Sequence, residues 1–180
     1  MAHLSGSIGY PGQTSELGYS SGASLKIPLG TRARDGAGNE YIYLDYNAAK
    51  AAGEIVSWDG SYLASAVGAT TVGPIGVVCG EASSSDLAGW VQIYGYCANL
   101  LASSSLTSGF LAAGATTDGY SVPVNGGAST AQEYRIMGMK ALSAASTATS
   151  PGYASTASSI LGVATAWLNY PHTTVLDVTS

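Results

Sequence analysis

GTRARDGAGNEYIYLDY, residues 30–46, is the stretch that decides the fold of this chain. Successive side chains of EYIYLDY point to opposite faces of an extended strand, so that every second residue shares a face. The two faces are Tyr41, Tyr43 and Asp45 on one side and Ile42, Leu44 and Tyr46 on the other. The preceding GAGN supplies the backbone freedom that a hairpin turn requires. The stretch therefore predicts a strand that is entered through a hairpin turn.

Short strand signals separated by turn residues continue to the C-terminus. EIVSW and SYLAS flank a turn at Asp59-Gly60, and a Ser-rich loop joins PIGVVCG to AGWVQIYGYC. Weaker strand signals follow in SGFLAAG, DGYSVPVN, YRIMGMKALSAAS, SSILGVATAWLNY and TTVLDVTS. With 24 Gly and 6 Pro spread through the chain, we expect an all-β fold: a single compact β-barrel or β-sandwich domain over residues 30–180. Residues 48–53 and 130–142 contain good helix formers, which leaves short helical pieces as an alternative there.

Residues 1–29 form a different kind of segment. They are rich in Gly, Ser and Pro and show neither a strand nor a helix period, so we expect an extended N-terminal arm. Apolar anchors are spaced through it, and the alternative is a disordered leader. The anchors are Leu4, Ile8, Tyr10, Leu17, Tyr19, Leu25 and Ile27.

The chain is poor in charge. Only 9% of residues are charged while 46% are hydrophobic, against roughly 25% charged in an average soluble domain. A surface built from Ser, Thr, Ala, Gly and Tyr indicates a protein that is covered by copies of itself or by a larger partner. A net charge of −5 without a basic run disfavours nucleic acid. The longest apolar run is about nine residues, below the roughly 20 that span a bilayer, and the N-terminus lacks signal-peptide features, so we expect cytoplasmic synthesis and reduced thiols.

The two cysteines fit this expectation. A hairpin between PIGVVCG and WVQIYGYC places Cys79 opposite residues 90–92 and Cys97 opposite residues 72–74. The two are then not partners across the strands. We expect buried or half-buried free thiols, with a disulfide or a reactive nucleophile as the alternatives.

No catalytic or metal-binding motif stands out. His3 and His172 have no ligand-type neighbours at zinc spacing, and no G-x-S-x-G elbow occurs. Residues 35–40 resemble a calcium loop only faintly, and a plain turn is the favoured interpretation. Scattered carboxylates suit a glycosidase only if two of them face each other across a cleft, and solvated faces or turns are favoured for each. These are Asp45, Glu54, Asp59, Glu81 and Asp86. We expect no enzyme activity, cofactor or metal.

Arg32 and Arg34 are the candidate binding residues of this region. They lie two apart, so an extended strand points both to one face, where they would grip a carboxylate-bearing surface or serve as a solvated strand edge. Aromatic residues at strand spacing suggest core and interface packing, with a sugar platform as the alternative. They are Tyr41, Tyr43, Tyr46, Trp58, Tyr62, Trp90, Tyr94 and Tyr96.

Several of these runs together resemble the head decoration, or capsid-stabilising, virion structural proteins of tailed bacteriophages. The resemblance covers roughly residues 28–172. Its most specific parts are the LGT…GNEYIY segment, the GWVQIYG strand at 89–95 and LNYP at 168–171. The longer Gly/Ser-rich leader and the cysteines at 79 and 97 depart from the family pattern.

The resemblance implies a non-enzymatic β domain, commonly trimeric, on the outer capsid surface of the virion. Its partners would be the major capsid protein and its own copies in a homotrimer, with no nucleic acid and no membrane. The expected partner contacts are Tyr10, Tyr19, Leu25, Ile27, Arg32 and Arg34. The alternatives are a glycan- or receptor-binding head fibre or tail component, which requires an exposed aromatic cluster beside polar side chains, and a small hydrolase.

Overall fold

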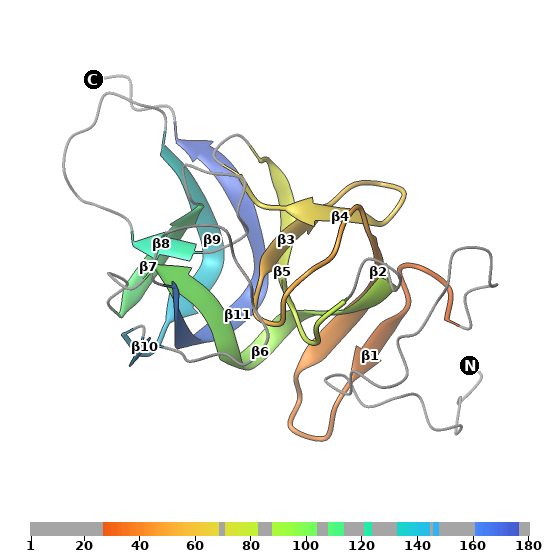
Figure 1. Ribbon diagram of the computed structural model, residues 1–180, viewed down its shortest axis with the longest axis horizontal. Coiled ribbons are helices and arrows are strands. Elements are labelled where there is room, and N and C mark those ends of the chain that lie inside the picture. The colour runs from red at the N-terminus through yellow and green to blue at the C-terminus, as the bar shows by residue number, and fades with distance from the viewer. Residues whose placement is uncertain are drawn as a thin grey trace.

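The computed structural model shows an all-β fold (Figure 1). It describes residues 27–68, 71–82, 88–103, 108–113, 121–123, 133–144, 146–147 and 161–176. These residues contain strands and turns and no helix, which confirms the predicted all-β class. The short helical pieces allowed for at 48–53 and 130–142 are wrong within the described residues: a bend and a turn occupy the first segment, and the second is strand from residue 133. Glycines at 53 and 138, both at positive φ, interrupt any helix there.

The N-terminal strands follow the predicted hairpins. β1 (Arg32–Arg34) pairs antiparallel with β2 (Glu40–Tyr46), as Arg34 opposite Glu40 shows. β3 (Ile55–Trp58) pairs antiparallel with β4 (Leu63–Ala66) across the predicted Asp59-Gly60 turn. In that turn the Asp59 carboxylate accepts hydrogen bonds from the backbone N–H groups of Ser61 and Leu63. β5 (Gly73–Val78) then pairs with β3.

Two strands of 16 residues each, β6 (Ala88–Ser103) and β11 (Leu161–Leu176), form the backbone of the sheet. β6 changes partners along its length: its first half pairs with β2 and β5, and its second half pairs with β11. β11 runs unbroken through Pro171, whereas the sequence had suggested two separate strands there. A long strand that leaves one neighbour for another bends the sheet back on itself.

The exchange of partners corrects one cysteine prediction. Cys79 lies opposite Trp90, as expected, because its N–H donates to the Trp90 carbonyl at 3.0 Å. Cys97 does not lie opposite residues 72–74; it pairs with Ala166 on β11. Both thiols are free, Cys79 half-buried and Cys97 buried, as predicted. Burial raises the pKa of each thiol, that of Cys97 to about 11, so neither is a ready thiolate.

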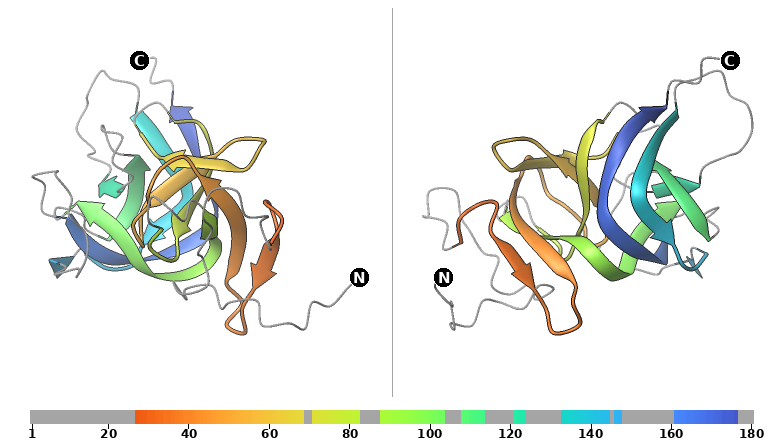
Figure 2. Two further views of the ribbon diagram at one scale, coloured as in Figure 1. Left: turned by 45° about the vertical axis from the view of Figure 1, so that its right-hand side comes forward. Right: turned by 180° about the vertical axis from the view of Figure 1, so that it is seen from behind.

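The C-terminal strands complete a single sheet. β7 (Gly109–Ala113), β8 (Ser121–Pro123), β9 (Glu133–Ala141) and β10 (Ser146–Thr147) join it in the order β1-β2-β4-β3-β5-β6-β8-β7-β9-β11-β10. Additional pairings, β2–β6, β5–β11 and β6–β11, fold this order back on itself. β9 and β11 run side by side, which the view from behind in Figure 2 shows clearly.

The alternation of EYIYLDY places its two faces in two different clusters. Ile42, Leu44 and Tyr46 pack with residues of β3, β5 and β6, while Tyr41 and Tyr43 pack with Ala88 and Trp90 on the other face. Tyr43 and Trp90 meet edge to face, with ring centroids 5.2 Å apart. A third cluster, formed largely from β5, β6, β9 and β11, fills the other half of the domain. The alternation predicted from the sequence is confirmed, and both faces of β2 contribute buried side chains.

Candidate functional site

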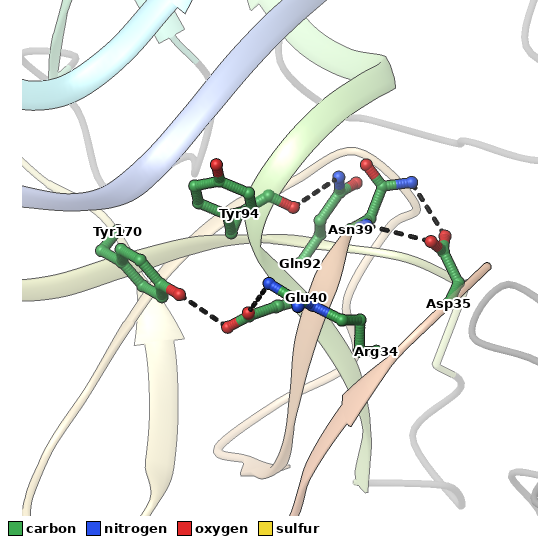
Figure 3. Close-up of polar contacts among 7 residues, drawn as sticks. All are labelled: Arg34, Asp35, Asn39, Glu40, Gln92, Tyr94 and Tyr170. Atoms are coloured by element: carbon green, nitrogen blue, oxygen red, sulfur yellow. Dashed lines mark hydrogen bonds and ion pairs between the residues drawn. The ribbon is translucent and has the colours of Figure 1, made fainter. Parts of the chain in front are cut away.

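The β1–β2 hairpin is held by the Asp35 carboxylate at its turn (Figure 3). This carboxylate accepts hydrogen bonds from the backbone N–H groups of Ala37 and Asn39, both at 2.9 Å, and from the side chains of Asn39 and Tyr41, both at 2.8 Å. Slight burial raises the pKa of Asp35, but the hydrogen bonds outweigh it and hold the pKa below its ordinary value. Residues 35–40 therefore form a hydrogen-bonded turn, which is the interpretation that the sequence favoured over a calcium loop.

Asn39 fastens this hairpin to β6. Its Oδ1 accepts a hydrogen bond from the Tyr96 N–H at 2.9 Å. Gly95 permits the contact, because it has a φ of 97° and a Cβ there would lie 2.1 Å from Asn39 Oδ1. The buried Gln92 amide donates to the carbonyls of Tyr94 and Tyr96, at 3.2 and 3.0 Å. Side-chain amides thus fix the part of β6 that carries Tyr94 and Tyr96.

Glu40 links the hairpin to β11. One carboxylate oxygen lies 2.6 Å from Arg34 Nη2, and the other accepts a hydrogen bond from the Tyr170 hydroxyl at 2.7 Å. The hydrogen bond to Glu40 raises the pKa of Tyr170, and the positive charges of Arg32 and Arg34 oppose that effect. Figure 3 shows Arg34, Glu40 and Tyr170 in a row beside the Tyr94 ring.

Aromatic rings gather around this polar row. The Tyr94 ring lies 5.2 Å from that of Tyr170 and 6.2 Å from that of Trp167, centroid to centroid. Tyr96 is the cross-strand neighbour of Trp167 and therefore shares its face of the sheet. We name this group the aromatic shelf; its members are Tyr94, Tyr96, Trp167 and Tyr170. Tyr96, Trp167 and Tyr170 are 48%, 45% and 46% exposed, which is unusual for rings of this size.

The backbone around the shelf is irregular. Tyr170 has a φ of 47°, a left-handed backbone conformation that residues other than glycine rarely adopt. It lies where the pairing of β11 with β9 shifts register between Leu168 and His172. Gly138 of β9 faces this bulge at a φ of 76°, and a Cβ there would lie 2.5 Å from the Asn169 carbonyl oxygen. The bulge turns the Tyr170 ring toward Tyr94 and Glu40.

The predicted partner contacts have different positions. Tyr10, Tyr19 and Leu25 lie outside the described residues. Ile27 is half-buried and, with Leu29, packs against the cluster that contains Tyr41 and Trp90. Arg32 and Arg34 are both exposed and share one face of β1, as predicted. Arg34 pairs with Glu40, whereas no carboxylate among the described residues lies within salt-bridge distance of Arg32.

The scattered carboxylates do not form a centre. Asp59 caps its own turn, Asp45 lies beside that turn, where its N–H donates to the Tyr62 carbonyl, Glu81 is exposed, and Asp86 is outside the described residues. Glu54 closes a turn, as its N–H donates to the Ala51 carbonyl at 3.1 Å, but it does not lie on a solvated face: it is buried and pairs with the buried Lys50 at 3.5 Å. His172 is exposed on β11, and His3 is not among the described residues. Within the part of the chain that the structure describes, no three His, Cys, Asp or Glu residues are grouped so as to hold a metal ion.

Tyr94 and Tyr96 were among the aromatic residues expected in packing or a sugar platform, whereas Trp167 and Tyr170 were not. The signal available was an alternation of Trp167 and Asn169 with buried Leu168 in AWLNYP, which marks a strand with one solvent face. Only the register of β11 against β6 brings these rings to Tyr94.

No family model, curated protein or solved structure matches this chain. No helix in the described residues is long and apolar enough to cross a membrane.

Proposed function

We propose that this chain is a non-enzymatic decoration, or cement, protein that binds the outer surface of the major capsid shell of a tailed bacteriophage and stabilises it. The observation that carries the proposal is the make-up of the surface. A chain with only 9% charged residues leaves many large apolar side chains exposed in its described part. They are Tyr62, Leu63, Val72, Tyr96, Met137, Leu142, Trp167 and Tyr170. Surfaces of this kind suit a protein that is covered on several sides by neighbours.

Repetition supplies the strength of such a protein. A capsid presents many identical sites, and linking several weak contacts raises avidity by roughly 10²–10⁴ without any single strong site. A homotrimer would engage several subunits at once. Interfaces of about 800 Å² per partner, one with the capsid and one with neighbouring copies, would cover much of the uncharged surface.

The proposed capsid contacts are the N-terminal arm, with Tyr10, Tyr19, Leu25 and Ile27, and the β1 strand with Arg32 and Arg34. Ile27 and Leu29 anchor the root of the arm to the domain beside β1. Arg32 is the stronger candidate of the two arginines, because Arg34 already shares its charge with Glu40. In this proposal the curved sheet is the expected barrel or sandwich, and the arm extends from its β1 edge.

Binding of the full-length protein to purified expanded heads tests the proposal. We expect saturable cosedimentation at a ratio near that of the capsid protein, and greater resistance of the decorated heads to heat. Arg32→Glu should weaken binding about tenfold or more, because it opposes the carboxylate-bearing partner surface. Glu81→Gln, an exposed change elsewhere, is the control. A protein that ignores expanded heads, or that is present at only a few copies per virion, contradicts the proposal.

A glycan-binding head fibre or tail component is a second candidate, because the aromatic shelf with Glu40 and Arg34 is an exposed aromatic cluster beside polar side chains. Copy number per particle separates the two candidates: near-stoichiometric for cement, and few for a fibre or tail part.

A further inference from the structure

We propose that the aromatic shelf and the charged side chains beside it form a binding site for oligosaccharides that carry carboxylates. This inference deepens the glycan-binding candidate by giving it a site and a ligand class. It does not depend on capsid decoration, because a cement protein whose shelf faces away from the shell would present the same site.

The shelf offers flat apolar surface of the right form. Tyr96 and Trp167 are directly opposite each other on adjacent strands, about 4.8 Å apart in the hydrogen-bonding direction. Trp167 is in turn opposite Lys140 of β9, so two rings and an ammonium group follow one line across three strands. The C–H face of a pyranose packs against an aromatic ring through dispersion and the attraction of C–H hydrogens to the negative ring face. Extended sugar chains can therefore lie across this line.

Polar groups border the rings where sugar hydroxyls would project. The Glu40 carboxylate accepts, Arg34 donates, and the exposed Asn169 side chain does both. Glu40 and Arg34 already hold each other and Tyr170 in place, so these groups need little reorganisation to meet a ligand.

The charges beside the rings favour a saccharide over the core of a protein interface. Charged residues are depleted from the centres of protein–protein interfaces. This chain has few charges to distribute, yet Arg34, Glu40 and Lys140 all adjoin the shelf. A surface that alternates rings with charged and amide groups matches a ligand that alternates C–H faces with hydroxyls.

The sign of the charge selects an acidic sugar. Glu40 is neutralised by Arg34, while Lys140 is exposed and Arg32 is near enough to influence Tyr170. Among the described residues neither Lys140 nor Arg32 has a salt-bridge partner, so positive charge borders the shelf on a chain whose net charge is −5. An ammonium group beside an indole ring can pair with a sugar carboxylate while the ring holds the sugar face.

The backbone holds the shelf in one geometry. Tyr170 at a φ of 47°, Gly95 at 97° and Gly138 at 76° surround it. Residues other than glycine rarely adopt a left-handed conformation, and such strain concentrates at functional sites.

The test is an array of acidic and neutral oligosaccharides probed with the full-length protein, followed by NMR titration of the strongest binder. We expect the acidic sugars to bind and their matched neutral sugars not to bind. Trp167→Ala should weaken the affinity at least tenfold. Lys140→Gln should reduce the preference for acidic sugars, and added salt should weaken binding of the wild-type protein more than binding of this variant, which retains Arg32.

Tyr62→Ala is the matched control, because Tyr62 is a comparably exposed ring, at 39%, outside the shelf. The proposal is overturned if no array sugar binds above the Trp167→Ala background, if neutral and acidic sugars bind alike, or if Tyr62→Ala loses as much affinity. It is also overturned if Trp167→Ala abolishes cosedimentation with heads, since the shelf is then the capsid-binding surface. Failure to bind heads at all, with sugar binding intact, removes the decoration proposal alone.

Discussion

Two ion pairs in this molecule each join a basic side chain to a glutamate, but one is exposed to solvent and the other is buried. Arg34 and Glu40 lie 2.6 Å apart with side chains 63% and 19% exposed, whereas Lys50 and Glu54 lie 3.5 Å apart with side chains 4% and 6% exposed. The shorter pair is the exposed one, so distance does not rank them. Water screens the exposed pair, which makes it worth about 0–1 kcal/mol, while an uncompensated charge left inside the protein costs several kcal/mol. One pair belongs to the fold and the other to a surface site.

The position of the buried pair explains its role. Lys50 forms an isolated bridge with Ala82, and the Gly53 N–H donates to the Val78 carbonyl, so this segment fastens β2 and β3 to the end of β5. Burial raises the pKa of Glu54, while a hydrogen bond from the Ala51 N–H and the charge of Lys50 partly offset this effect. Each charge of the pair therefore offsets part of the cost of burying the other.

The largest effect is expected from breaking the buried pair. Lys50→Met alone leaves Glu54 buried without its cation, and we expect a loss of about 3–5 kcal/mol in the free energy of unfolding. Replacing both partners, Lys50→Met with Glu54→Leu, should recover most of the loss, because no charge then remains inside. Chemical denaturation measures all three proteins. A single variant that loses less than about 1 kcal/mol would show that water reaches the pair and that the contrast with Arg34 and Glu40 is wrong.

The surface site is expected to depend on its backbone more than on its ion pair. Gly95→Ala forces a left-handed alanine and drives its Cβ into Asn39 Oδ1, so we expect a loss of about 2 kcal/mol and a disturbed shelf. Gly36→Ala in the neighbouring turn is the control, because its Cβ meets nothing within 4 Å and its φ is not positive. Denaturation gives the stability, and NMR shifts of the shelf residues report the geometry. Equal effects of the two variants would contradict the assigned role of Gly95.

The pH dependence of stability tests the burial of Glu54. Because the folded pKa of Glu54 is raised, its stabilising contribution is complete below its unfolded pKa and is lost as pH rises through the folded value. Lys50→Met removes the opposing cation and should raise the folded pKa of Glu54 further. Each added pKa unit corresponds to about 1.4 kcal/mol of stability lost at a pH above the folded pKa. We therefore expect Lys50→Met to lose stability relative to wild type as pH rises from about 4.5 to 7. The double variant, which lacks the carboxyl group, should not show this loss; a parallel decline in both would assign it to another group.

The same contrast separates what sequence predicts from what it does not. The β1–β2 hairpin, the two faces of β2 and the turn at Asp59 are local, and alternation and turn chemistry were enough to predict them. Cys97 was misplaced because β6 leaves β5 for β11 after Gln92, and no local pattern encodes such an exchange. The shelf requires the register of β11 against β6 and a bulge at Tyr170, so only its half on β6 was visible. The alanines and Lys50 in AAKAAG are good helix formers, which suggested a helix at 48–53 where the chain instead turns at Gly53.

The smallest change in stability is expected at the exposed pair. Arg34→Ala should cost no more than about 1 kcal/mol, and less in high salt, because water and ions already screen the Arg34 guanidinium. A double-mutant cycle with Glu40→Gln measures the coupling by denaturation at low and high salt. Tyr170→Phe keeps the ring but removes the hydroxyl that donates to Glu40, and it measures what this hydrogen bond adds to the stability of the Arg34–Glu40 pair. A coupling above about 2 kcal/mol would mean that Arg34 and Glu40 support the fold as Lys50 and Glu54 do; a weak, salt-sensitive coupling leaves them available to a ligand.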